Sequence, residues 1–288
     1  MTGTKAASLQ IGGLRTLAAR RPLTTFLLAG LFIIWPVAWL IPLSAHDVVP
    51  GFGEWLLSPL IILYFLIVVG IIWAAEGKTG VLAFLARIVR WRFGIGWWVA
   101  IAAGLPALAI CFNLALGASF RTEGLGEVLL RQAWAAVVTG MLLVNLWEEA
   151  VWAGFLQTRL ERTRRILPAA WLAAIPFVII HIPLQFVGAF DLASVAIGIL
   201  ALFIFALFFR PMMAFALRGS GDSLLAVGLF HAVFNITSSP TGLVAALTPG
   251  VDPVGSTLFA TVVMTVGMGL AVRTKLSRAY RLEVLEAR

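Results

Sequence analysis

The sequence has little charge and almost no cysteine. Charged residues make up 12% of its 288 residues and hydrophobic residues make up 61%, whereas about 25% of the residues of a soluble domain are charged. A water-soluble chain of this length could not bury so much apolar surface, and a disordered chain would have far less of it. The composition therefore excludes a soluble enzyme, a soluble binding module and a disordered protein. The single cysteine, Cys111, excludes an intramolecular disulfide and a cysteine-based zinc site.

Long apolar runs account for most of the chain. A helix that crosses the hydrocarbon core of a bilayer needs about 20 apolar residues. The sequence predicts eight such runs, at 23–43, 55–75, 95–117, 132–157, 167–189, 192–209, 222–239 and 254–272. We therefore expect an all-α polytopic integral membrane protein. About eight transmembrane helices should form a single membrane domain over residues 1–288 and surround a buried polar site.

The basic residues indicate how these helices are oriented. Of the 21 Lys and Arg residues, 19 precede the first run, follow the last run or lie in every second loop. This is the pattern of eight spans with both termini in the cytoplasm. The net charge of +8 is then a topology signal and does not indicate nucleic acid binding. Residues 79–93 are predicted to form an amphipathic surface helix, and residues 273–288 a cytoplasmic tail. The 18 Arg against 3 Lys favour a GC-rich bacterial source, and hence a bacterial plasma membrane.

A few ionisable residues lie inside the apolar runs. A charged group at the bilayer centre costs at least about 2.5–3.5 kcal/mol, which makes such residues candidates for function. Glu148, Glu149 and His181 each have apolar sequence on both sides. His231 and Asn235 are four residues apart and share one face of a helix. Each alone would suit an interhelical hydrogen bond. Together they predict one site, which we expect in the cytoplasmic half of the membrane, with water supplied from a cavity open to the cytoplasm.

These groups suit hydrolysis of an amide. A carboxylate and an imidazole on either side of a water molecule can deprotonate it, and a second histidine with an asparagine amide can donate hydrogen bonds to a developing oxyanion. The competing account is a zinc site in which Glu148, His181 and His231 are ligands and Glu149 is the base. The sequence favours metal-free, glutamate-based chemistry, because it has no His-Glu-x-x-His motif, and it leaves zinc as an alternative.

The residues resemble the CAAX protease and bacteriocin-processing (Abi) family of intramembrane proteases, which is related to the type II CAAX prenyl endopeptidase. The family's motifs are Glu-Glu-x-x-x-Arg, Phe-x-x-x-His and His-x-x-x-Asn or Asp, on three successive helices. This chain matches them in order and spacing over about 130–240, with Glu148-Glu149, with Phe177 and His181, and with His231 and Asn235.

The resemblance implies roles for these residues. Glu148 is expected to activate water together with His181, His231 and Asn235 to stabilise the oxyanion, and Glu149 to support them. The implied partners are membrane lipid and a membrane-associated or lipidated peptide, which is the implied substrate. Some members of the family are tied to bacteriocin immunity or have no protease role, so a non-catalytic membrane scaffold is the main alternative. A proton-coupled transporter is the weaker one.

The first motif departs from the family at one position. The family's arginine would stand at position 153, where this chain has Ala153. That arginine would lie four residues after Glu149 on the same helix and could pair with it. Without it, activity is in doubt. We predict that Glu149 is either protonated or paired with another group, such as an arginine from another helix.

Overall fold

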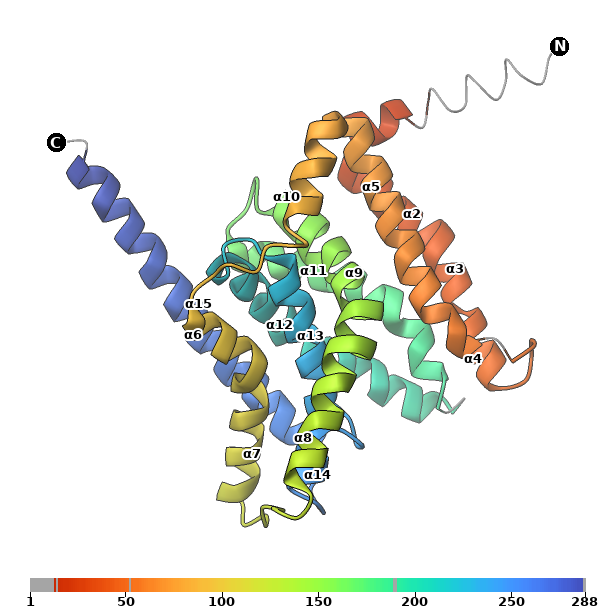
Figure 1. Ribbon diagram of the computed structural model, residues 1–288. Coiled ribbons are helices and arrows are strands. Elements are labelled where there is room, and N and C mark those ends of the chain that lie inside the picture. The colour runs from red at the N-terminus through yellow and green to blue at the C-terminus, as the bar shows by residue number, and fades with distance from the viewer. Residues whose placement is uncertain (1–12, 14, 52, 189–190, 287–288) are drawn as a thin grey trace.

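The computed structural model describes residues 13, 15–51, 53–188 and 191–286, which contain helices and no strand. This confirms the predicted all-α fold. Figure 1 shows α2 to α5 along one flank of the bundle, and α15 crossing the other flank as a long diagonal helix. In chain order the elements are α2 (Pro22–Ala29), η1 (Gly30–Ile34), α3 (Trp35–Ala38), α4 (Leu40–Ala45), α5 (Gly53–Ala86), α6 (Ile95–Val99), η2 (Ala100–Gly104), α7 (Leu105–Ala115), α8 (Leu125–Trp134), η3 (Ala135–Asn145), α9 (Leu146–Glu149), η4 (Ala150–Gln157), α10 (Thr158–Leu160), α11 (Ile166–His181), η5 (Ile182–Phe186), α12 (Leu192–Gly219), α13 (Leu224–Ser238), α14 (Leu243–Leu247) and α15 (Pro253–Glu286).

Seven helical stretches among the described residues are long and apolar enough to cross a membrane. They are Pro22–Ala45, Trp55–Ala86, Ile95–Ala115, Leu125–Leu160, Ile166–Phe186, Leu192–Gly219 and Pro253–Lys275. The exception to the predicted eight is the run at 222–239, where α13 has only 15 residues. Its length is about 22 Å at 1.5 Å per residue, less than the roughly 30 Å of a hydrocarbon core. The described residues thus contain seven stretches of spanning length and one short apolar helix, where the sequence predicts about eight spans.

The short helix α13 lies inside the bundle. It packs against η2 and α7, against η3 and α9, and against α12 and α15. Most of its residues are buried, among them Leu224, Phe230 and His231. A helix enclosed by its neighbours does not need to match the thickness of the bilayer, which explains why α13 can be shorter than the others. Its position in the centre brings His231 and Asn235 to the site.

Wide helical turns flank the two glutamates. The π-helical segments η3 and η4 lie directly before and after α9, the single turn that carries Glu148 and Glu149. Such segments often occur at functional sites. Elsewhere the wide turns precede prolines: η1 precedes Pro36 and η2 precedes Pro106. There the proline lacks the N–H of a regular helical bond and displaces the carbonyl four residues earlier.

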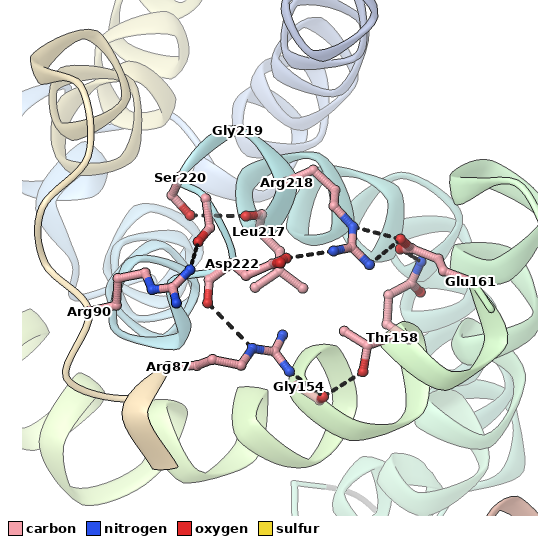
Figure 2. A network of polar contacts seen from close by, with 12 residues as sticks. Arg87, Arg90, Gly154, Thr158, Glu161, Leu217, Arg218, Gly219, Ser220 and Asp222 are labelled. Carbon is pink, nitrogen blue, oxygen red and sulfur yellow. Dashed lines mark hydrogen bonds and ion pairs between the residues drawn. The ribbon is translucent and has the colours of Figure 1, made fainter. Parts of the chain in front are cut away.

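A polar network joins the loops at the end of the bundle that carries most basic residues (Figure 2). Arg87 donates from Nη1 to the carbonyl of Gly154 at 2.9 Å and from Nε to the carbonyl of Asp222 at 3.4 Å. Burial lowers the pKa of Arg87, and the nearby Asp222 carboxylate opposes that shift. Arg218 pairs with both Glu161 and Asp222. The network fixes the turn that precedes α13.

The same contacts bear on the predicted surface helix over 79–93. Non-helical backbone at Gly77 (φ 68°, ψ −163°) breaks α5, and a second helical stretch follows this kink and ends at Ala86, so the first part of the predicted helix is present. Beyond that point the chain binds the turn before α13: the amide of Leu224 donates to the carbonyl of Arg87 at 2.9 Å, and the hydroxyl of Ser223 donates to the carbonyl of Arg90. These arginines therefore bind other parts of the chain, which ends the helix early. At the C-terminus, α15 continues to Glu286, so the predicted tail at 273–288 begins as an extension of the last span.

A glycine holds α13 against the glutamate helix. A Cβ atom added at Gly228 would lie 2.8 Å from the Cα atom of Leu146, closer than real Cβ contacts. We expect Gly228→Ala to destabilise the protein by about 1–3 kcal/mol, because it overpacks a tight contact. In Gly70→Ala, the matched control on an exposed face of α5, the added Cβ meets nothing within 4 Å, so stability should stay the same or rise slightly. Thermal unfolding in detergent measures both, and equal effects would contradict the close approach.

Candidate active site

The structure brings all five predicted site residues into one cluster. Glu148 and Glu149 come from α9, His181 is the last residue of α11, and His231 and Asn235 lie on α13. Consecutive residues of a helix point about 100° apart, so the two glutamates face different partners. Glu148 lies against His181, and Glu149 lies against His231. The cluster thus has two halves that meet at α9, and Nδ1 of His231, 3.7 Å from Oε2 of Glu148, also joins them.

The contact between Glu148 and His181 requires a shared proton. Nδ1 of His181 lies 2.6 Å from the carbonyl oxygen of Phe177, one turn earlier on α11. A carbonyl only accepts hydrogen bonds, so Nδ1 carries the proton of the neutral ring and Nε2 is left as an acceptor. Nε2 lies 3.2 Å from Oε1 of Glu148, which is also an acceptor when ionised. The two groups therefore hold one proton between them, on the imidazole or on the carboxyl.

The second half of the cluster is a buried ion pair. Nη1 of Arg210 donates to both carboxylate oxygens of Glu149, at 2.8 and 3.0 Å, and both side chains are fully buried. The Oε1 atom of Glu149 also lies 3.0 Å from Nδ1 of His231. The guanidinium faces the rings of Phe177 and Phe209 at 5.3 and 5.9 Å. One carboxylate thus connects α9 with α12 and α13, and the prediction that Glu149 pairs with an arginine from another helix is confirmed.

Arg210 is the site residue that sequence reasoning missed. The predicted sixth run ends at 209, which places Arg210 in the loop that follows. Helix α12 instead continues to Gly219, and Arg210 is 0% exposed within it. The signal was present in the sequence: a second basic residue, Arg218, follows one run of apolar residues later and marks the true end of the helix. The count of basic residues on one side therefore includes one residue of the core.

Two asparagines complete the first half of the cluster. Asn145 donates from Nδ2 to Oε2 of Glu148 at 3.3 Å, and Asn235 donates from Nδ2 to Oδ1 of Asn145 at 3.3 Å. Asn145 is buried. Its bond to Glu148, three residues along the chain, orients that carboxylate, and its bond from Asn235 links the orientation to α13.

The cluster opens into a mostly apolar cavity of about 310 Å³. Glu148, His181, His231 and Asn235 line it, whereas Glu149 and Arg210 do not. Its other walls come mainly from aliphatic and aromatic side chains of η1, α4, α5, η5 and α12, including Ile34, Ile41, Leu57, Leu60, Leu184 and Phe205. A ligand in this cavity would have few polar partners other than the candidate catalytic groups.

The described His, Cys, Asp and Glu side chains form no group of three that is placed to share a metal ion. The proposed zinc ligands are already engaged with other groups: His181 with Glu148 and Phe177, and His231 with Glu149. A zinc ion would need both imidazoles and Glu148 to aim one atom each at a common point about 2.0–2.2 Å away. The arrangement fits hydrogen-bonded acid–base groups better than a zinc site.

Comparison with known families points to the same segment. Residues 130–237 match the family model described as type II CAAX prenyl endopeptidase Rce1-like. This segment is an Rce1-like domain. It contains all five predicted site residues and Arg210, and it runs from α8 into α13. No curated protein and no solved structure matches the chain.

The buried pair within the Rce1-like domain can be tested by its effect on stability. We expect Arg210→Met to destabilise the protein by about 3–5 kcal/mol, because it leaves the charge of Glu149 buried without a partner. Adding Glu149→Gln should restore more than half of that loss, since the second change removes the unpaired charge. Unfolding in mixed micelles would measure both variants.

Arg162→Met is the matched control for this prediction. Arg162 is 64% exposed and pairs with Glu76 at 3.2 Å, so its loss should cost no more than about 1 kcal/mol. The buried pair would be refuted as a structural element if Arg210→Met were as mild as this control.

Proposed function

We propose that the protein is an intramembrane endopeptidase that hydrolyses a peptide bond in a membrane-associated or lipidated protein. The observation that carries the proposal is the Glu148–His181 contact at 3.2 Å, at the wall of an otherwise apolar cavity that His231 and Asn235 also line. A carboxylate and an imidazole that share a proton beside a space large enough for a peptide chain form a candidate general base. The Rce1-like domain at residues 130–237 supports the same reaction class.

The geometry supports the following sequence of steps. With the shared proton on His181, the Glu148 carboxylate takes a proton from a water molecule, and the hydroxide forms a bond to the carbonyl carbon of the substrate. The carbonyl oxygen becomes an oxyanion, which accepts hydrogen bonds from Asn235 and His231. The oxyanion then re-forms the C=O bond as the C–N bond breaks, and the proton that Glu148 took from water moves to the leaving amine. No group besides water is consumed.

His231 needs a particular orientation for this role, and Glu149 supplies it. Both carboxylate oxygens of Glu149 accept from Arg210, so Oε1 is an acceptor and Nδ1 of His231, 3.0 Å away, is placed to donate to it. Nε2 is then the nitrogen left for the substrate. A buried carboxylate behind an imidazole also stabilises the protonated ring, which is the form that can donate from Nε2. Glu149 and Arg210 are therefore positioning residues and need not touch the substrate.

The main alternative loses its principal support. Ala153 suggested a non-catalytic scaffold, because Glu149 had lost the arginine expected on its own helix. Arg210 provides that positive charge from α12 at 2.8 Å. The missing motif arginine is thus no longer a reason to expect an inactive site.

Peptide cleavage by the purified protein in liposomes tests the proposal. On a library of lipidated and plain peptides, we expect Glu148→Gln to lower the cleavage rate by about 10²- to 10⁴-fold, because the general base is lost. Asn235→Ala should lower the rate by about 10²- to 10³-fold, because one oxyanion donor is lost. Glu123→Gln is the matched control, since Glu123 is 88% exposed and pairs only with Arg121 at 3.8 Å.

Two arms separate the mechanisms. Cleavage that survives a strong chelator supports glutamate-based water activation, whereas loss on chelation with rescue by zinc would favour the metal alternative. Normal cleavage by folded Glu148→Gln protein would overturn the assigned general base. Substrate flux into sealed vesicles without any cleavage would instead support the transporter.

A further inference from the structure

We propose that substrate and water reach the site from the membrane face opposite the basic loops, which is the extracytoplasmic face. The substrate class is then a membrane-associated peptide segment presented at the outer surface. The reaction at the site rests on the function proposed above, whereas the route to the site rests on how the bundle is packed.

Contacts between loops define the two ends of the bundle. At the basic end, Arg159 and Arg162 bind Glu76, and Lys275 donates to the carbonyl of Gly219 at 3.2 Å; Figure 2 shows more of this end.

At the other end, different chain segments meet. The amide of Arg121 donates to the carbonyl of Leu247 at 2.9 Å, and Gln132 donates to the carbonyl of Thr241 at 3.1 Å. His46 lies 2.8 Å from the carbonyl of Phe186. The site lies between these two ends.

The half of the bundle between the site and the basic end is closely packed. Every residue of η4, which follows the two glutamates toward the basic loops, is buried. On α12 the segment from Arg210 to Leu217 is buried throughout. On α13, Leu224, Ala226 and Val227 are each 0% exposed. A peptide or a file of water molecules would have to displace this packing to enter from the basic end.

The apolar cavity extends in the opposite direction. On α5 it uses Leu57 to Tyr64, in the part that begins at Gly53 and lies before the kink at Gly77. On α12 it uses Leu202 to Phe209, on the side of Arg210 that leads to Leu192. On the fifth span it continues past His181 to Leu184. Val151, Trp152 and Phe177 line the cavity on the basic side of the catalytic groups, but on α5, α12 and the end of the fifth span it extends toward the end away from the basic loops.

A second cavity supplies a polar route from the same end. It has a volume of about 570 Å³ and is lined by Arg131, Gln132, Thr139, Ser239 and Thr241, among others. Asn235 lines both this cavity and the apolar one. The residue proposed to bind the oxyanion therefore stands where a polar space and an apolar space meet. Water could reach the scissile bond through the polar cavity, while an apolar part of the substrate occupies the apolar cavity.

Charge fixes which membrane face this is. Basic residues concentrate in cytoplasmic loops. When the buried Arg210 is left out of the count, one side still has far more Lys and Arg residues than the other, whose loops contain Arg121 and Arg131. The end that carries both cavities is therefore extracytoplasmic. This differs from the sequence-based expectation of a water cavity open to the cytoplasm, because that expectation used depth along the helices and could not include packing.

Labelling of single cysteines tests the route. With Cys111→Ser as background, Thr139→Cys and Thr241→Cys report on the polar cavity, and Thr163→Cys, an exposed threonine in the turn at the basic end, is the matched control. A membrane-impermeant maleimide should label both cavity cysteines in intact cells and the control only after permeabilisation. Labelling of Thr163→Cys in intact cells, or protection of Thr139→Cys from the outside, would overturn the proposal.

A second readout links the route to the reaction. In proteoliposomes, full modification of Thr139→Cys by a bulky maleimide should slow cleavage at least about tenfold relative to the same unmodified variant, and modification of Thr163→Cys should not. Unchanged cleavage after full modification of Thr139→Cys would overturn the polar cavity as a route. If the unmodified protein cleaves no peptide, the endopeptidase proposal fails, and the labelling pattern still decides which face the cavities reach.

Discussion

The buried pair of Glu149 and Arg210 is the constraint around which the site is built. Removing a charge from water costs several kcal/mol per ion even after relaxation, so such a pair persists only where close geometry and further hydrogen bonds compensate. Here the carboxylate accepts twice from Arg210 and lies 3.0 Å from His231. Nε and Nη2 of Arg210 have no hydrogen-bond partner among the described residues, and the guanidinium faces the rings of Phe177 and Phe209 instead. The requirement to keep this pair dry explains why η4, the inner part of α12 and the first turns of α13 are so completely buried.

The origin of the arginine changes what the pair does. An arginine at position 153 would lie on the same helix as Glu149 and would stabilise that helix alone. Arg210 comes from α12, so its bond to Glu149 ties two spans together, and the contact with His231 adds α13. The position of the motif arginine is occupied by Ala153, and the bond from Arg210 to Glu149 links two helices instead. A motif that is read along one helix does not include this arginine, although Glu149 has a positively charged partner in both arrangements.

Much of the fold and most of the site could be predicted, because both follow from a strong physical signal. Seven spans lie close to the predicted runs, because a helix that crosses the hydrocarbon core needs a long apolar run. Glu148, Glu149 and the histidines were visible because charge inside apolar sequence is costly. Arg210 was hidden because a charge near the end of a run looks the same whether it ends the helix or lies within it. The short α13 and the end of α5 at Ala86 depend on tertiary contacts, which a single sequence does not contain.

The two adjacent glutamates separate the protein into a dry half and a wet half. Because neighbours on a helix point about 100° apart, Glu149 turns into the packed half and is 0% exposed, whereas Glu148 reaches the cavity. An ion pair gains strength where water is excluded, and hydrolysis needs water at one defined place. A single helical turn meets both needs only if packing closes one side of α9 and cavities open on the other. The direction of access is therefore linked to the ion pair: the side that holds Arg210 must stay closed, which leaves the opposite end of the bundle for the substrate.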